Sequence, residues 1–185
     1  MTTILISCSK KQIPETLIFT DINQVMMAPV YIAEVNGYFK DENLTIIYNN
    51  FTSGRDATVS LLAGESDIGA SAGFPLVLHI MNGEDLQILT TVHRTNENQG
   101  LVVRKDSGIT QISDLKDKRV GIVLGSSSEY VLSLLLNEAG LTIEDITLVN
   151  MMPQETPIKL ASNVVDAIIT WSPNVANAVK ALPPD

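Results

Sequence analysis

Short apolar runs alternate with helix-like patterns along nearly the whole chain. Runs rich in apolar and β-branched residues predict strands at 16–20, 44–48, 67–70, 86–92, 100–104, 119–123, 146–149 and 166–169. Helical patterns, several of them closed by Gly or Asn-Gly, predict helices at 29–33, 57–63, 75–81, 129–139, 156–162 and 174–182. Strands that alternate with helices on this scale pair in parallel through crossover helices. The order therefore predicts an α/β fold whose sheets are covered on both faces.

The alternation is interrupted at the polar turn residues Lys105-Asp106-Ser107-Gly108. It restarts beyond them, so we expect two α/β lobes in series. The predicted division is an N-terminal segment at 1–15, a first lobe at 16–103 and a second lobe at 104–185. A chain of 185 residues is long enough for two small lobes of this kind.

A strand of the second lobe runs through Gly125 into three consecutive hydroxyls, Ser126-Ser127-Ser128, at the predicted start of a helix. In open parallel sheets a ligand lies beyond the carboxyl ends of the strands, where helix N-termini present free amides. These serines are therefore candidate ligand contacts. Ser126 and Glu129 also have the S-x-x-E spacing of a capping box. The two roles are compatible, because one cap leaves other first-turn amides free.

Composition and charge narrow the classes of partner. Hydrophobic residues make up 45% of the chain and charged residues 18%, which is typical of a folded globular protein. The formal net charge of −9 argues against a nucleic-acid partner, which needs clustered Lys and Arg. No apolar run reaches the roughly 18 residues of a membrane-spanning helix. We therefore expect membrane contact only through a possible lipid anchor.

The candidate for that anchor is Cys8, the only cysteine. Its surroundings, Leu5-Ile6-Ser7-Cys8-Ser9-Lys10-Lys11, resemble the lipobox of bacterial lipoproteins, in which cleavage before the cysteine is followed by lipid attachment. Only seven residues precede Cys8, fewer than a complete signal peptide needs. The alternative interpretation is a lone thiol. An unmodified Cys8 in a membrane-free protein would contradict the anchor, and mass spectrometry distinguishes the two.

Several motifs together resemble one protein family. The run at 28–44, APVYIAEVNGYFKDENL, looks like the opening of the nitrate/sulfonate/taurine-type solute-binding proteins of ABC importers. The resemblance continues in order through AGESDIG at 63–69, GFP at 73–75, ISDLKDKRVG at 112–121, VDA at 165–167 and WSP at 171–173. It implies a type II periplasmic-binding-protein fold, in which two lobes joined by a hinge close on a small solute. It also implies delivery of that solute to an ABC permease outside the cytoplasm, in the periplasm or at the cell surface.

The chain departs from the family in two places. Asn43 stands where the family usually has glycine, an exchange that is harmless because Asn tolerates the left-handed conformation. The second departure is length, since the resemblance covers about the first two-thirds of such a protein. We therefore expect an incomplete second lobe with an exposed apolar patch, and weakened or absent solute affinity.

By family position, the solute contacts lie in the loops after the strands. The first-lobe candidates are Asn23, Gln24, Ser53, Gly54, Ser71, Gly73, Phe74, His93 and Arg94, and the second-lobe candidates are Ser126, Ser127, Ser128 and Trp171. Amide and hydroxyl donors suit an anionic solute such as a sulfonate or nitrate, and Arg94 offers a fixed charge.

Five of these candidates also have a purely structural interpretation. Gly73 fits a tight turn, Phe74 a core position, and His93 and Arg94 a solvated loop, while Trp171 fits either a cleft wall or the core. Ser53 forms a second possible capping pair, with Asp56.

Two other functions share this fold class. One is the binding of a thiamine-precursor pyrimidine or another heterocycle, which the low aromatic content of 5% disfavours. The other is an enzyme. The sequence has no G-x-S-x-G elbow, no C-x-x-C, no H-E-x-x-H and no P-loop, so we expect no catalytic residue, no metal and no cofactor.

Overall fold

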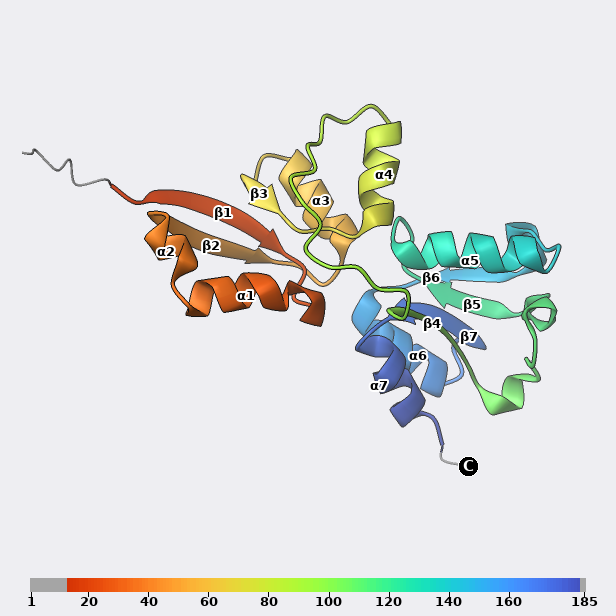
Figure 1. Ribbon diagram of the computed structural model, residues 1–185. Coiled ribbons are helices and arrows are strands. Elements are labelled where there is room, and N and C mark those ends of the chain that lie inside the picture. The colour runs from red at the N-terminus through yellow and green to blue at the C-terminus, as the bar shows by residue number, and fades with distance from the viewer. Residues whose placement is uncertain (1–12, 184–185) are drawn as a thin grey trace, which may run out of the picture.

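A computed structural model describes residues 13–183, and Figure 1 shows two α/β lobes side by side. In the first lobe, β1 (Glu15–Asp21) lies between β2 (Leu44–Asn50) and β3 (Ile68–Gly69), and all three strands are parallel. The helices of this lobe are α1 (Ala28–Val35), α2 (Tyr38–Asp41), α3 (Gly54–Leu62) and α4 (Gly73–Met81), and a 3-10 turn, η1 (Val25–Met27), precedes α1.

The second lobe has a four-stranded sheet in the order β4-β7-β5-β6. Its strands are β4 (Gln99–Val103), β5 (Arg119–Ile122), β6 (Thr147–Asn150) and β7 (Ala167–Trp171). Its helices are α5 (Ser127–Glu138), α6 (Thr156–Ala161) and α7 (Asn174–Ala181), and four short 3-10 turns lie at 105–107, 112–115, 143–145 and 153–155. β5 is parallel to β6 and β7, and the crossover helices are α5, between β5 and β6, and α6, between β6 and β7.

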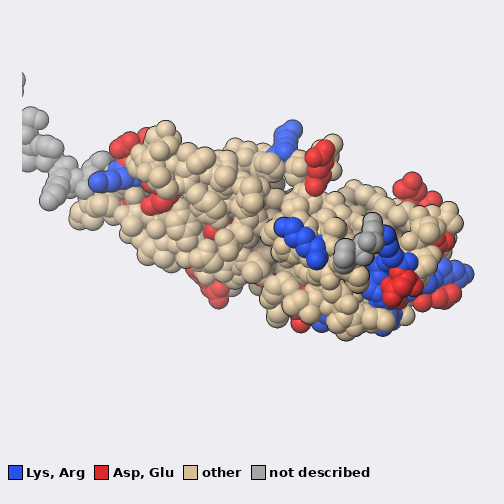
Figure 2. All heavy atoms as spheres, turned by 90° about the horizontal axis from the view of Figure 1, so that it is seen from below, with Lys and Arg blue, Asp and Glu red and all other residues tan. Residues whose placement is uncertain are grey.

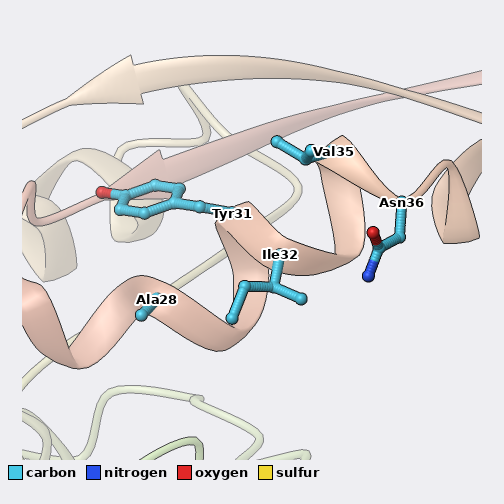
Figure 3. Close-up of a pocket in the computed structure, with 5 residues that line it drawn as sticks. All are labelled: Ala28, Tyr31, Ile32, Val35 and Asn36. Carbon is cyan, nitrogen blue, oxygen red and sulfur yellow. The ribbon is translucent and has the colours of Figure 1, made fainter.

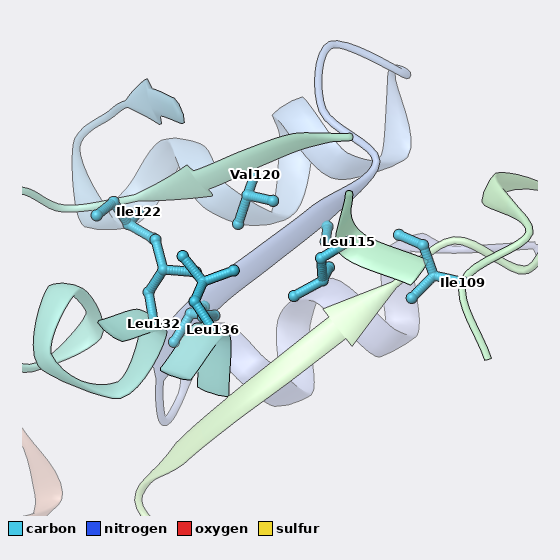
Figure 4. Close-up of a cluster of buried hydrophobic side chains, with 8 residues drawn as sticks. Ile109, Leu115, Val120, Ile122, Leu132 and Leu136 are labelled. Atoms are coloured by element: carbon cyan, nitrogen blue, oxygen red, sulfur yellow. The ribbon is translucent and has the colours of Figure 1, made fainter. Parts of the chain in front are cut away.

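Two apolar clusters cover opposite faces of the second sheet. The cluster in Figure 4 packs Leu132 and Leu136 of α5 against Val120 and Ile122 of β5, with Leu115 alongside. The cluster on the other face joins the sheet to α6 and α7 and includes the fully buried Leu160 and Ala178. The first lobe has a smaller buried core, formed by Ile22, Met27 and Ala57. The predicted α/β fold class is confirmed.

Residues 86–92 do not form the predicted strand. They belong to an irregular segment, in which Ile88 and Leu89 are 62% and 72% exposed. A strand needs the backbone groups of a neighbouring edge, and β3 offers only two paired residues. The apolar, β-branched pattern indicates a tendency to extend but carries no information about whether such an edge exists.

β4 also differs from the prediction. It pairs antiparallel with β7, so Gln99–Val103 belongs to the second sheet although the predicted division places it in the first lobe. The segment between α4 and β4 contains no helix, and the pairing partner of β4 is β7 at the other end of the second lobe. The polar turn at 105–108 therefore follows the first strand of the second sheet and does not separate the lobes.

Exposed apolar side chains gather mainly on the first lobe, whereas we expected them on the second. Val35, Met81 and Leu89 are 85%, 79% and 72% exposed. The second sheet has helices on both faces, which explains its better cover. Asn43 adopts the predicted left-handed conformation with φ 58°.

Candidate functional site

A narrow groove lies between the two lobes and collects loops from both. Its first-lobe wall comes from Gln24, Met26, Gly54, Ala72 and Pro75. Its other wall comes from Asn98, Gln99, Ser126, Ser127 and Trp171. The groove encloses about 30 Å³, which is space for roughly one or two water molecules. Five predicted site residues therefore meet here: Gln24, Gly54, Ser126, Ser127 and Trp171.

On the first-lobe side, α3 begins at the groove because of a serine cap and a glycine contact. Ser53 is fully buried; its Oγ accepts a hydrogen bond from Asp56 N at 3.1 Å and donates to Asp56 Oδ2 at 2.9 Å. A Cβ on Gly54 would lie 2.5 Å from the backbone N of Ala72. The start of α3 can therefore pack this closely against the 70–73 loop only because residue 54 is glycine. Ser71 Oγ joins the same two elements by donating to the Gly54 carbonyl at 2.9 Å.

The turn after β1 is held by a buried carboxylate. Asp21 is 2% exposed and accepts hydrogen bonds from Tyr31 Oη at 2.6 Å and from Asn23 N at 3.1 Å. Burial, followed by this hydrogen bond to Asp21, raises the pKa of Tyr31. Asn23 has φ 47°, so it shapes the turn that carries Gln24 into the groove.

On the second-lobe side, Ser126 caps α5 as predicted, but the capping box differs from the expected one. Ser126 Oγ accepts from Ser128 N at 3.2 Å, and Glu129 Oε2 accepts from Gly125 N at 2.6 Å instead of from the cap residue. Ser128 is fully buried and its Oγ accepts from Val123 N at 3.1 Å. Ser128 is therefore part of the turn and does not line the groove, whereas Ser126 and Ser127 do.

Three helices begin at the lobe junction with unused backbone donors. Within residues 13–183, the N–H groups of Gly54, Gly73 and Ser127 donate no hydrogen bond, and these residues open α3, α4 and α5. Each helix has at least eight residues, so its aligned peptide dipoles place partial positive charge at this end. The combination favours an acceptor or an anion between the lobes.

Two direct contacts join the lobes beside the groove. Phe74 stacks on Tyr130 of α5 with ring centroids 5.3 Å apart and an interplanar angle of 26°. Arg55 Nη1 donates to the Leu124 carbonyl at 3.4 Å. A Cβ on Gly125, which has φ +73°, would come within 3.0 Å of Arg55 Cδ. Phe74 is thus neither part of a core cluster nor a lining residue but an interlobe contact.

Trp171 and its neighbours form the far wall. Trp171 is 5% exposed and lines the groove at the end of β7, opposite Gln99 of β4 in the strand ladder. Asn98 and Gln99 were not predicted, because the antiparallel pairing that places β4 beside Trp171 leaves no local signal. Ala72 and Pro75 were not predicted either, because their residue types carry no recognisable chemistry. Met26, for which packing was the favoured interpretation, also lines the groove.

The other eight predicted residues do not line the groove: Asn23, Ser53, Ser71, Gly73, Phe74, His93, Arg94 and Ser128. His93 and Arg94 are exposed in the irregular 84–98 segment and are not among the lining residues. Gly73 lies between the lining residues Ala72 and Pro75, and a Cβ there would meet nothing within 4 Å. Its turn therefore does not require glycine.

A larger hollow of about 250 Å³ lies elsewhere, along the outer side of α1. Figure 3 shows that Ile32 and Asn36 point away from the sheet there, while Tyr31 points toward the strands. Ala28 and Val35 complete the lining, so this surface is almost entirely apolar. It contains none of the predicted site residues.

The residues that line the groove carry no charge. On the face shown in Figure 2, the first lobe and the junction are mostly uncharged, whereas more Lys, Arg, Asp and Glu side chains gather on the second lobe. None of the lining side chains titrates near neutral pH. Arg55 and Glu129 lie close to lining residues in the chain, but both make hydrogen bonds within the protein. Arg55 donates to the Leu124 carbonyl, and the Glu129 carboxylate accepts from Gly125 N.

Known proteins resemble this chain in sequence and in fold. A family model described as NMT1/THI5 like matches residues 24–181. The alkanesulfonate-binding protein SsuA of Xanthomonas axonopodis pv. citri, solved with bound MOPS, superposes with a TM-score of 0.73 and 25% identity. The alignment covers 86% of this chain and 55% of that one. The predicted binding-protein fold is confirmed, and the chain is incomplete relative to such structures.

Two curated relatives point to different activities. A protein of Bacillus subtilis (strain 168) named for aliphatic sulfonate binding is 27% identical over 154 residues, which cover 81% of this chain and 46% of that protein. A 4-amino-5-hydroxymethyl-2-methylpyrimidine phosphate synthase of Aspergillus parasiticus is 30% identical over 146 residues, which cover 77% of this chain and 39% of that protein. The chain spans about half the length of the curated relatives it matches.

Proposed function

The chain belongs to the NMT1/THI5-like family, and from this membership and the groove we propose that it binds a small anionic solute for an ABC importer. The observation that carries the proposal is the convergence of three helix N-termini with unused N–H groups, at Gly54, Gly73 and Ser127, on one junction. Such donors bind an oxyanion without any charged side chain. The relative named for aliphatic sulfonates and the neighbour solved with MOPS support a sulfonate as the solute class.

Solute entry requires movement of the lobes. A sulfonate is larger than the one or two water molecules that fit in the groove of about 30 Å³. The interlobe contacts at Phe74–Tyr130 and Arg55–Leu124 must therefore separate and re-form around the solute. As part of this proposal, the closed lobes dock on an ABC permease. The proposed location is the periplasm or the cell surface.

The location rests on structural neighbours described as periplasmic binding proteins. In the described part of the chain, no helix combines the length and apolar character needed to cross a bilayer. Cys8, the predicted lipid attachment site, lies outside the described residues. Its modification stays a prediction, to be tested by mass spectrometry of the membrane fraction.

The proposal is tested with Trp171, the only tryptophan and a lining residue. Ethanesulfonate, nitrate and an aminopyrimidine are titrated while Trp171 fluorescence and the thermal midpoint are followed. A solute that binds the folded state raises that midpoint in proportion to the logarithm of its concentration. We expect the sulfonate to change both signals.

A blocking variant and a matched control locate the binding site. Ser127→Leu places an apolar side chain in the groove, whereas Ser133→Leu makes the same change at an exposed position of α5. The proposal requires the first variant to lose the sulfonate response and the second to keep it. Equal responses in both variants would place the solute elsewhere.

Pyrimidine chemistry is the second candidate, since a relative is named as a pyrimidine phosphate synthase. The lining residues oppose it on two counts. Trp171 is the only aromatic side chain among them, and no lining side chain is a usable acid or base near neutral pH. Stabilisation by the aminopyrimidine alone, or its turnover, would favour this candidate over the sulfonate.

A further inference from the structure

The wall of the groove contains a buried acceptor with no partner. Among the described residues, three buried side-chain oxygens have no hydrogen-bond partner: Thr20 Oγ1, Ser66 Oγ and Gln99 Oε1. Only Gln99 of these three lines the groove. A buried acceptor without a donor is costly, so the groove contains one polar position that a bound molecule can satisfy.

Gln99 is held in place by the strand ladder. It is the first residue of β4 and lies opposite Trp171 of β7, and the Asn98 carbonyl next to it accepts a hydrogen bond from Ser172 N at 3.0 Å. These pairings fix the backbone of Asn98 and Gln99. The Gln99 side chain is therefore carried by a fixed strand and not by a loop that follows the solute.

We propose that Gln99 is a specificity-determining residue that selects solutes bearing a hydrogen-bond donor next to their acidic group. The inference rests on the proposed function, since it concerns the same solute. The helix N-termini at the junction meet the acidic group, and Gln99 Oε1 accepts from an N–H or O–H on the rest of the molecule. Hydroxy- and amino-substituted sulfonates fit both requirements, whereas nitrate and plain alkanesulfonates fit only the first.

Three sulfonates of similar size separate the possible causes of a preference. 2-Hydroxyethanesulfonate offers a donor, 2-methoxyethanesulfonate offers only an acceptor, and ethanesulfonate offers neither. Each is titrated by calorimetry into the 185-residue chain. We expect 2-hydroxyethanesulfonate to bind about tenfold more tightly than the other two, the effect of satisfying one buried acceptor.

Substitution of the residue isolates its role. Gln99→Met keeps the length of the side chain but removes the amide, and removal of an unpartnered polar group leaves the fold intact or more stable. This variant should bind all three sulfonates within about threefold of one another. Gln87→Met, at an exposed position of the irregular segment outside the groove, serves as the control and should keep the tenfold preference.

Each outcome decides the question. Equal binding of the three sulfonates by the unaltered chain overturns the role of Gln99, as does a preference that survives in Gln99→Met. A preference shared by 2-methoxyethanesulfonate shows that size or an acceptor matters instead of a donor. If no sulfonate binds at all, sulfonate binding by the 185-residue chain is refuted, and that result is distinguishable from the others.

Discussion

Removal of the Asp166 carboxylate should destabilise the second lobe and flatten its acid sensitivity. Asp166 precedes β7 and accepts from Arg119 Nη2 at 2.7 Å, from Arg119 Nε at 3.0 Å and from the Arg119 backbone N at 2.9 Å. Arg104 Nη1 lies 3.7 Å from Asp166 Oδ1, and its side chain is 10% exposed. These groups lie at the amino ends of β5 and β7, opposite the groove.

The magnitude follows from the pKa. The pKa of Asp166 is lowered from 3.8 to about 2, and the largest cause is the side-chain hydrogen bond from Arg119. At 1.36 kcal/mol per pKa unit, this difference corresponds to about 2 kcal/mol of stability. The carboxylate is 15% exposed, so solvent screens it little. Because the pKa is lower in the folded state, this stability is present above pH 3.8 and is lost as the pH falls through about 2.

Urea unfolding of Asp166→Asn at several pH values measures this contribution. At pH 7 we expect a loss of about 2–4 kcal/mol, because the variant also leaves the buried Arg104 with a weaker partner. The difference in unfolding free energy between the variant and the unaltered chain should shrink as the pH falls below 3.8. Asp41→Asn, at an exposed position, is the control and should change little. A variant as stable as the unaltered chain at pH 7, or a gap that does not depend on pH, would refute the reasoning.

Three further substitutions test the packing of the first lobe and of the lobe junction. In Gly69→Ala, the new Cβ would lie 1.6 Å from the buried Thr20 Oγ1, so we expect a loss of about 1–3 kcal/mol in urea unfolding. Gly73→Ala meets nothing within 4 Å and should change stability by less than about 0.5 kcal/mol; equal effects of the two would contradict the packing argument. Tyr130→Ala removes the stack on Phe74, worth about 1 kcal/mol, and should speed amide hydrogen exchange at the start of α4. Unchanged exchange there would show that the stack does not hold the lobes together.

Local signals in the sequence predicted most elements of the fold. Gly140 closes α5 in the left-handed conformation with φ 69°, as its position after a helical pattern indicated. Ser53 and Ser126 cap the helices that the cap rule assigned to them. These predictions succeed because caps and helix ends depend on a few neighbouring residues.

Features that depend on distant partners were not predictable. The run at 86–92 has the composition of a strand but no strand edge to pair with. β4 is antiparallel because it pairs with β7, about 70 residues later in the chain. The same limit applied to the site. Strand-end loops placed Ser126, Ser127 and Trp171 correctly at the groove, whereas Gln99 enters it only through that antiparallel pairing.

The uncharged lining has a consequence for the pH dependence of binding. A sulfonate stays ionised across the neutral range, and no lining side chain titrates there, so the proposed binding by backbone dipoles predicts the same attraction at every pH. Affinity for a sulfonate should therefore vary by less than about twofold between pH 5.5 and 8.5, a range that spans the usual titration of histidine. Calorimetry across this range measures it, with His93→Gln as the comparison. A rise in affinity below about pH 6.5 that His93→Gln removes would bring the exposed 84–98 segment into the site and would contradict recognition by neutral donors alone.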